Sequence, residues 1–313
     1  MKKSVTFIAL LIFLLAGCST DKTTEQDMKN LPNLSAQTAL ILVHGTGGST
    51  DTFDGFSDVF IDDYHTSNER IKLHIGTDGA LTYHGTFSKK ALHPIVQIGF
   101  ADSIDASITQ QAIWLRLAME DLQKKYKFAA FEGVGHSNGG LVLSIYAQKY
   151  AKTAPTLERL VAIGSPYNDL DPDDNKGDLA FTDVPKATPL LQKYEKNRAK
   201  INPDLLVLSI ASNIDDGSFS DDIVPVLSAF GSRLIFKNEA KAYLESYYKG
   251  EEYDHRTLFA SPDIQKKIAW FLYEYPGDKK EISLAKNKKL ALCQLLGSKI
   301  EVRVRDSIAY ASF

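Results

Sequence analysis

Apolar runs and amphipathic runs alternate along the chain. The run ALILV at 39–43 is continuously apolar and ends in the letters HGTGG, which is typical of a strand buried on both faces and followed by a loop. Residues 71–75 and 81–84 alternate apolar and polar side chains around Asp78-Gly79, which predicts a β-hairpin. By the same criteria, further strands are expected at 94–100, 128–134, 160–163, 205–210 and 233–236, and helices at 108–126, 141–150, 189–200 and 264–273.

Strands that alternate with helices at this spacing predict an α/β domain. Its central sheet is expected to be mostly parallel, with helices on both faces and the hairpin as an insertion. The acidic segment at 167–183 has no clear periodicity. Because a loop of that length inside a compact domain is commonly functional, we expect it to act as a lid.

The N-terminus has the pattern of an export signal. Lys2 and Lys3 precede an apolar run at 5–15, which is too short to span a membrane, and the letters LAGC then end at Cys18. We therefore expect residues 1–17 to be a lipoprotein signal peptide, and Cys18 to be lipidated and to hold the exported protein on the cell membrane. A plain secretory signal with a chance cysteine is the alternative.

The rest of the chain divides into three parts. Residues 18–37 are polar and charged, which predicts a flexible tether, and residues 38–275 suit one large α/β domain. Residues 276–313 form a C-terminal extension to which the pattern assigns no structure. Once Cys18 is acylated, Cys293 has no disulfide partner, so we expect it to be a small core residue.

The amino-acid composition adds no new feature, but it excludes some classes of partner. The hydrophobic fraction of 44% is ordinary for a globular protein, and the net charge of -3 argues against a nucleic-acid partner. Nothing in the sequence predicts a protein partner. The expected partners are a small-molecule substrate and the membrane that receives the lipid anchor.

A G-x-S-x-G pentapeptide carries the main chemical prediction. It runs from Gly135 to Gly139, between a predicted strand and a predicted helix, which is the context of a nucleophile elbow. We therefore expect Ser137 to be an activated nucleophile. The oxyanion hole would combine the backbone N–H of Asn138 with one from the HGTGG loop, for which we choose Thr46.

A serine nucleophile needs a base and an acid, in the chain order Ser, Asp, His for this arrangement. His255 is the only histidine after Ser137, so it is the expected base. The acid is expected in the segment DDIVP, which follows the strand at 205–210. We favour Asp221 and keep Asp222 as the alternative.

The acidic segment also contains part of a calcium-binding pattern. Asp169, Asp171 and Asp173 have the alternating spacing of a calcium loop, but Asp174 replaces the required glycine and Ala180 occupies the final ligand position. A solvated acidic loop is the better interpretation, and a loose calcium site stays open. No His or Cys cluster has zinc spacing, so neither a metal nor a cofactor is expected.

The motifs in combination resemble a known family. The segments HGTGG, TDGALTYHG, HPIVQIGF, GHSNGG, VAIGSPYN, SDDIVPV and DHRTL are similar to the α/β-hydrolase family DUF915, whose members are surface or secreted proteins of Gram-positive bacteria with no known function. The resemblance runs from about residue 40 to 273. It implies the α/β-hydrolase fold and a triad at the positions of Ser137, Asp221 and His255.

Two departures from the family pattern affect the site. Asn138 stands where methionine is common, which should change the pocket floor and keep the N–H donor. Arg256 replaces the serine of the family's H-S-x-L segment and leaves His255 in place. Together these observations predict a surface serine hydrolase acting on carboxylic esters or lipid-like esters. The alternatives are a surface acyltransferase with the same triad and an inactive binding protein with the hydrolase fold.

Overall fold

The structure is a computed structural model that describes residues 31–150, 155–274, 300–304 and 307–311. Four features predicted from the sequence fall outside this part of the chain: the signal peptide at 1–17, Cys18, Cys293 and most of the tether at 18–37. The same holds for most of the C-terminal extension at 276–313. What the sequence predicts for these segments therefore remains a prediction.

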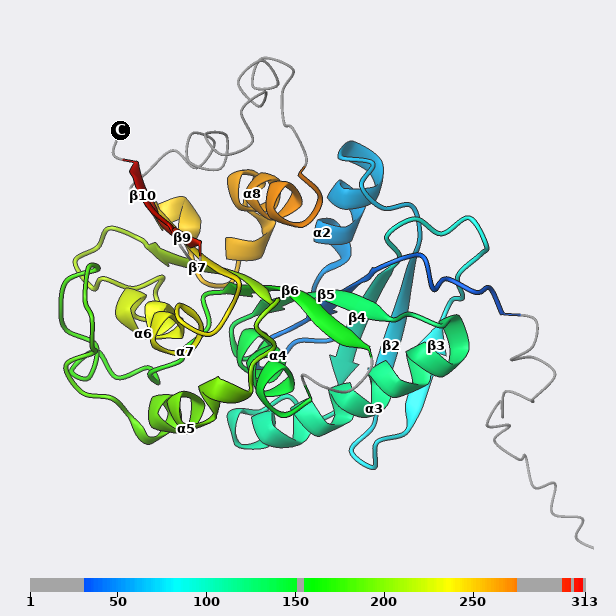
Figure 1. Cartoon of the computed structure of the whole chain (residues 1–313), viewed down its shortest axis with the longest axis horizontal. Helices are drawn as coiled ribbons and strands as arrows, with labels where there is room; N and C mark the ends of the chain where they lie inside the picture. Colours follow the sequence, from blue (N-terminus) through cyan, green and yellow to red (C-terminus); the bar gives the residue numbers. More distant parts are fainter. Residues whose placement is uncertain (1–30, 151–154, 275–299, 305–306, 312–313) are drawn as a thin grey trace, which may run out of the picture. The chain divides into compact units, whose positions relative to one another are not determined.

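A single sheet organises the described chain (Figure 1). Its strands are β1 (Ala39–Val43), β2 (Arg70–Ile75), β3 (Leu81–His84), β4 (Ile95–Phe100), β5 (Ala130–His136), β6 (Thr156–Ile163), β7 (Leu206–Asn213), β8 (Ala242–Lys249), β9 (Ile300–Val304) and β10 (Ser307–Ala311). Their order in space is β10-β9-β8-β7-β6-β5-β1-β4-β2-β3. Every pairing from β2 across to β8 is parallel, whereas β3, β9 and β10 pair antiparallel with their neighbours. The predicted mostly parallel sheet and the β2–β3 hairpin are confirmed.

Helices cover both faces of this sheet, as predicted. The α-helices are α2 (Asp54–Asp58), α3 (Ile108–Tyr126), α4 (Asn138–Lys149), α5 (Pro189–Asn197), α6 (Val226–Phe230), α7 (Ser232–Phe236) and α8 (Pro262–Tyr273). Short turns of other helix types are η1 (Val59–Asp63), η2 (Asp105–Ser107), η3 (Arg198–Lys200), η4 (Glu251–Tyr253) and η5 (Leu258–Ala260). Figure 1 shows α2 and α8 on one face of the sheet and α3 and α4 on the other. None of the described helices is long and apolar enough to cross a membrane.

The central strands are buried on both faces, which explains their continuous apolar sequence. In β1, Leu40 and Leu42 belong to a cluster that includes Phe56 of α2 and Ile268 of α8. Ile41 is equally buried and, because side chains alternate along a strand, faces the opposite side, where α4 lies. A buried parallel strand therefore loses the polar alternation that marks a half-exposed strand.

The prediction of a strand at 233–236 is wrong. These residues form α7, in which the hydroxyl of Ser232 donates a hydrogen bond to the carbonyl oxygen of Ala229 at 2.9 Å, and Ile235 and Phe236 are buried. A run of four mostly apolar residues is compatible with a short buried helix as well as with a strand, so the spacing of apolar residues could not distinguish the two. The strand that pairs with β7 is β8, which the sequence reading missed.

The acidic segment between β6 and α5 contains no described helix or strand. Buried Asn168 holds it together: its side-chain amide donates to the side chain of Asn175 at 3.0 Å and to the carbonyl of Lys186 at 3.1 Å. Its side-chain oxygen accepts from the N–H of Thr188 at 2.8 Å. The segment is thus tied at both ends to one side chain, and its action as a lid stays a prediction.

Candidate active site

Ser137 lies at the sharp turn from β5 into α4. Its backbone has φ 54° and ψ −127°, a strained conformation for a residue with a side chain. The small residues around it are required by close packing: a Cβ on Gly139 would lie 2.0 Å from the carbonyl oxygen of Val43, and one on Gly135 would lie 2.4 Å from the backbone of Gly139. The sequence G-x-S-x-G is therefore what allows the start of α4 to approach β1 and β5.

His255 and Asp221 form a buried pair beside this turn. The Nδ1 atom of His255 lies 2.7 Å from Oδ2 of Asp221, and the backbone N–H of His255 donates to the carbonyl of Asp221 at 2.8 Å. The other carboxylate oxygen accepts from the N–H groups of Val224 at 2.6 Å and Ile223 at 3.1 Å. Because the carboxylate accepts, Nδ1 carries the hydrogen, and the lone pair of Nε2 is left to take a proton.

Asp222 takes a different position. Its backbone has φ 83°, and its half-exposed carboxylate lies 3.6 Å from the guanidinium of Arg256. Gly164 adds a constraint on the Asp221–His255 pair, since a Cβ there would lie 2.9 Å from the carboxylate of Asp221. The geometry thus brings His255 together with Asp221 and directs Asp222 toward Arg256.

His136 supports the loop that carries His255. Its Nε2 donates a hydrogen bond to the carbonyl oxygen of His255 at 2.8 Å, and its ring lies 4.6 Å from the ring of His255 and 5.0 Å from that of Phe259. Burial, with a smaller contribution from His255, lowers the pKa of His136 to about 3. A neutral His136 can therefore fix the position of His255 without competing for its proton.

His44 fixes the loop after β1. Its Nδ1 lies 2.7 Å from the carbonyl oxygen of Gly45, and its Nε2 accepts from the N–H of Phe100 at 3.1 Å. Burial lowers the pKa of His44, so the neutral ring with its hydrogen on Nδ1 satisfies both contacts. A Cβ on Gly45 would lie 2.7 Å from the Cβ of Ser137. The loop backbone therefore runs directly against Ser137, next to Thr46.

Thr46 and Asn138 are joined through their side chains. The amide of Asn138 donates to the hydroxyl of Thr46 and to Oδ1 of Asp105, and the hydroxyl of Thr46 donates to the same oxygen, each at 2.6 Å. Asp105 is a residue that the sequence reading missed. The available signal was weak: an aspartate just beyond the carboxyl end of the strand at 94–100, where sites of α/β folds lie.

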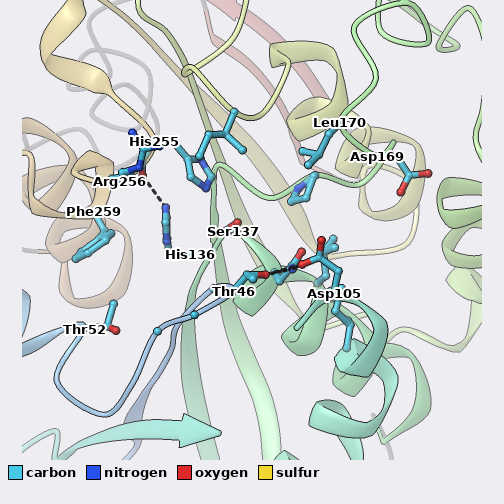
Figure 2. A pocket seen from close by; sticks show the side chains of 18 of the residues that line it. Thr46, Thr52, Asp105, His136, Ser137, Asp169, Leu170, His255, Arg256 and Phe259 are labelled. Carbon is cyan, nitrogen blue, oxygen red and sulfur yellow. Dashed lines mark hydrogen bonds between the residues drawn. The ribbon is translucent and has the colours of Figure 1, made fainter. Parts of the chain in front are cut away.

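Ser137, His255, Thr46, Asn138 and Asp105 line one cavity of about 830 Å³, a volume within the usual range of small-molecule sites. Figure 2 shows Ser137 between His255 and Phe259 on one side and Thr46 and Asp105 on the other. The apolar side chains in its wall are Ile108, Leu141, Pro166, Leu170, Leu190, Ile223 and Phe259. The arrangement offers a hydroxyl, a proton acceptor and backbone donors next to an apolar space.

The acidic loop next to the cavity is bonded within itself. The N–H of Asp173 donates to Oδ1 of Asp171 at 2.8 Å, and the carboxylate of Asp173 lies 2.5 Å from the ammonium of Lys176. Among the residues that the structure describes, no group of three or more His, Cys, Asp or Glu side chains could hold a metal ion. Asp169 instead lies in the cavity wall, beside Leu170.

Comparison with known families identifies the family of the chain. The model of the family described as "Alpha/beta hydrolase of unknown function (DUF915)" matches residues 28–275. The chain belongs to DUF915. The predicted resemblance and the α/β-hydrolase fold are therefore confirmed, and the chain is an α/β hydrolase of this family.

Two solved structures are similar to this DUF915 chain. A gene product from Listeria innocua is 41% identical, with a TM-score of 0.74 over 77% of this chain and 96% of its own. A protein from Lactobacillus plantarum, described provisionally as a cell surface hydrolase, is 27% identical, with a TM-score of 0.64 over 81% of this chain and 97% of its own. A search of curated proteins found no match.

Proposed function

We propose that this DUF915 chain is a serine hydrolase that cleaves carboxylic esters. The observation that carries the proposal is that Ser137 and His255 line one cavity while Asp221 holds the far nitrogen of His255 at 2.7 Å. A hydroxyl, an imidazole and a buried carboxylate in this order make up the machinery of acyl transfer through a serine. The oxyanion donors are the N–H groups of Thr46 and Asn138.

The proposed reaction has two steps. His255 accepts the proton of Ser137 through Nε2 as the serine oxygen bonds to the ester carbonyl carbon, and the negative oxygen is held by the two N–H groups. Protonated His255 then gives that proton to the leaving alcohol, which produces an acyl group on Ser137. In the second step His255 takes a proton from water as the water oxygen bonds to the acyl carbon. The bond from that carbon to the Ser137 oxygen then breaks, His255 returns the proton to that oxygen, and the carboxylic acid is released.

The shape of the cavity supports an ester with an apolar acyl group. Ile108, Leu141, Leu170 and Leu190 line the cavity and provide an apolar surface in the space that Ser137 and His255 also line. Burial of each CH₂ group there would contribute about 0.8 kcal/mol to binding. We propose esters or lipid-like esters as the substrate class on this ground.

The test compares Ser137→Ala with the wild-type chain, using a short-chain p-nitrophenyl ester and a fluorophosphonate probe. Wild type should hydrolyse the ester and become labelled, and Ser137→Ala should lose both, with activity down at least about 1000-fold. The matched control is Ser88→Ala, which removes an exposed serine that does not line the cavity and should keep full activity.

Two results would reject the proposal or change it. Equal hydrolysis by Ser137→Ala would remove the nucleophile assignment, and a wild-type chain that is neither active nor labelled would indicate a binding protein with this fold. If an added alcohol or amine takes the acyl group in preference to water, the enzyme is an acyltransferase that uses the same acyl-enzyme.

A further inference from the structure

A carboxylate joins the two residues proposed as oxyanion donors. Oδ1 of Asp105 accepts hydrogen bonds from the hydroxyl of Thr46 and the side-chain amide of Asn138, and that amide also reaches the hydroxyl of Thr46. All three distances are 2.6 Å. Figure 2 shows Asp105 and Thr46 meeting beside Ser137. Three segments far apart in sequence, the loop after β1, the loop after β4 and the start of α4, are thus joined at one point.

The last residue of β4 and the loop that follows it hold the loop after β1 at two more points. The hydroxyl oxygen of Ser103 accepts from the N–H of Gly47 at 3.1 Å, and the N–H of Phe100 donates to the ring of His44 at 3.1 Å. These contacts lie on both sides of Thr46. The position of the Thr46 N–H is therefore set by residues 100–105 and not by the glycine-rich loop alone.

Residues 102–107 are themselves anchored on α3. Oδ1 of Asp102 accepts from the hydroxyl of Ser107 at 3.0 Å, and the side-chain amide of Gln111 donates to that hydroxyl at 2.9 Å and to the carbonyl of Ile104 at 3.2 Å. Gln111 is buried within α3. Asp105 is thus attached to a rigid helix, and the loop after β1 is attached to Asp105.

This attachment matters because the two proposed donors differ in stiffness. The N–H of Asn138 belongs to the first turn of α4, whereas Thr46 lies between glycines, and Gly47 has φ 73°. Glycines leave a loop with many accessible conformations. An oxyanion hole works only when its donors are held where the negative charge develops, and a misplacement of about 1 Å costs about 100-fold in rate.

A carboxylate suits this task better than a neutral acceptor. Hydrogen bonds to a charged acceptor are about twice as strong as those between neutral groups. A bare carboxylate next to an oxyanion would repel it, but Oδ1 of Asp105 already accepts two hydrogen bonds, from the hydroxyl of Thr46 and the side-chain amide of Asn138. The gain in rate from holding the two donors in position can therefore exceed the loss from repulsion between the Asp105 charge and the oxyanion.

We propose that Asp105 is a positioning residue, which holds the oxyanion hole in its working shape by tying Thr46 to Asn138. The proposal deepens the proposed function and rests on it. Asp105 acts through Thr46 and Asn138, from whose side chains its carboxylate accepts hydrogen bonds. It acts by fixing the distance between a flexible loop and the end of a helix.

The first test compares Asp105→Ala, Asp105→Asn and an exposed-carboxylate control, Asp63→Ala, on a p-nitrophenyl ester. Asp105→Ala should lower kcat about 10-fold to 100-fold and change KM less than about threefold, because an oxyanion is bound only in the transition state. Asp105→Asn keeps an acceptor oxygen of the same shape without the charge, and its kcat should lie between those of Asp105→Ala and wild type. Asp63→Ala should match wild type, and all assays are run well below each variant's melting temperature.

A double-mutant cycle with Asn138→Ala separates positioning from general damage. Asn138→Ala keeps its backbone N–H and loses the side-chain amide that bonds to both Asp105 and Thr46, so both single variants disrupt the same three-residue hydrogen-bond cluster. The double variant should then be about as slow as the slower single variant. Rate losses that multiply would overturn the proposal, and so would a kcat within twofold of wild type in Asp105→Ala.

Hydrogen–deuterium exchange provides a measurement that needs no substrate. The amides of residues 45–48 should exchange at least about tenfold faster in Asp105→Ala than in wild type. In the variant the loop can open without first breaking hydrogen bonds to Asp105, so local opening costs less free energy. Unchanged exchange overturns the proposal whatever the activity. If exchange accelerates but wild type shows no Ser137-dependent activity, the tie exists and the failure lies in the proposed function.

Discussion

Asp221 and Asp222 are chemically identical neighbours, and the difference between them arises from the backbone. Asp222 has a left-handed φ of 83°, which turns its side chain toward Arg256 and leaves Asp221 to face His255. Asp221 is also held by the N–H groups of Ile223 and Val224. A carboxylate with fixed donors on one oxygen and an imidazole on the other is well suited to orient a base.

Exchanging each aspartate for asparagine tests this assignment. Asp221→Asn keeps the shape but loses the charge that holds the Nδ1 hydrogen, and we expect kcat/KM for a p-nitrophenyl ester to fall about 10,000-fold. Asp222→Asn should stay within about threefold of wild type. A comparable loss in both variants, or a larger one in Asp222→Asn, would contradict the choice of Asp221.

At the scale of elements, the strands β5 and β6 place a buried carboxyl group next to a partly exposed guanidinium. Glu132 of β5 lies opposite Arg159 of β6, with Oε1 2.7 Å from the guanidinium. The Glu132 side chain is 2% exposed, against 30% for Arg159. Burial raises the pKa of Glu132 from 4.5 to about 7, although Arg159 acts in the opposite direction.

This shift predicts how stability depends on pH. Between pH 4.5 and 7 the folded chain keeps a proton on Glu132 that the unfolded chain has lost, so the free energy of unfolding falls as pH rises, by about 3 kcal/mol in total. Glu132→Gln does not titrate and should remove this contribution. Urea unfolding of both chains at pH 4.5 and pH 8 measures it.

The difference in unfolding free energy between Glu132→Gln and wild type should shift by about 3 kcal/mol in favour of the variant from pH 4.5 to pH 8. Other titrating groups are common to both chains and cancel in this difference. An equal difference at the two pH values would show that Glu132 keeps an ordinary pKa in the folded chain.

At the scale of the whole molecule, we propose that an export signal and lipidated Cys18 place the domain on the outer side of the membrane. Cys18 lies outside the described residues, and the proposal rests on the letters LAGC after a short apolar run. An anchored enzyme would meet esters outside the cell.

Exchange of the cysteines separates an anchor from a plain secretory signal. In a Gram-positive host fed an alkyne fatty acid, wild type and Cys293→Ser should be labelled and should stay with the membrane. Cys18→Ser should be unlabelled and should leave the membrane fraction. Release of the wild-type chain into the medium without label would reject the anchor.

Local pattern accounts for much of the fold and part of the candidate site. The apolar run of β1, the alternation of β2 and β3 and the helical spacing of α3 each depend on neighbouring residues, so they could be predicted. The sequence pattern did not predict the strand β8 and wrongly predicted a strand at α7. Whether such a segment forms a helix or a strand depends on the residues that pack against it. The family resemblance also followed from motifs that can be read in order along the chain.

The sequence by itself determined that the chain has the α/β-hydrolase fold and that Ser137 follows a buried strand in a glycine-rich turn. Only the tertiary structure decided which aspartate faces His255, and that Asp105 meets Thr46 and Asn138. The physical reason is that strand and turn signals act over a few residues, whereas these contacts join residues 33 to 59 positions apart. Such contacts form only after the sheet brings the ends of its strands to one edge.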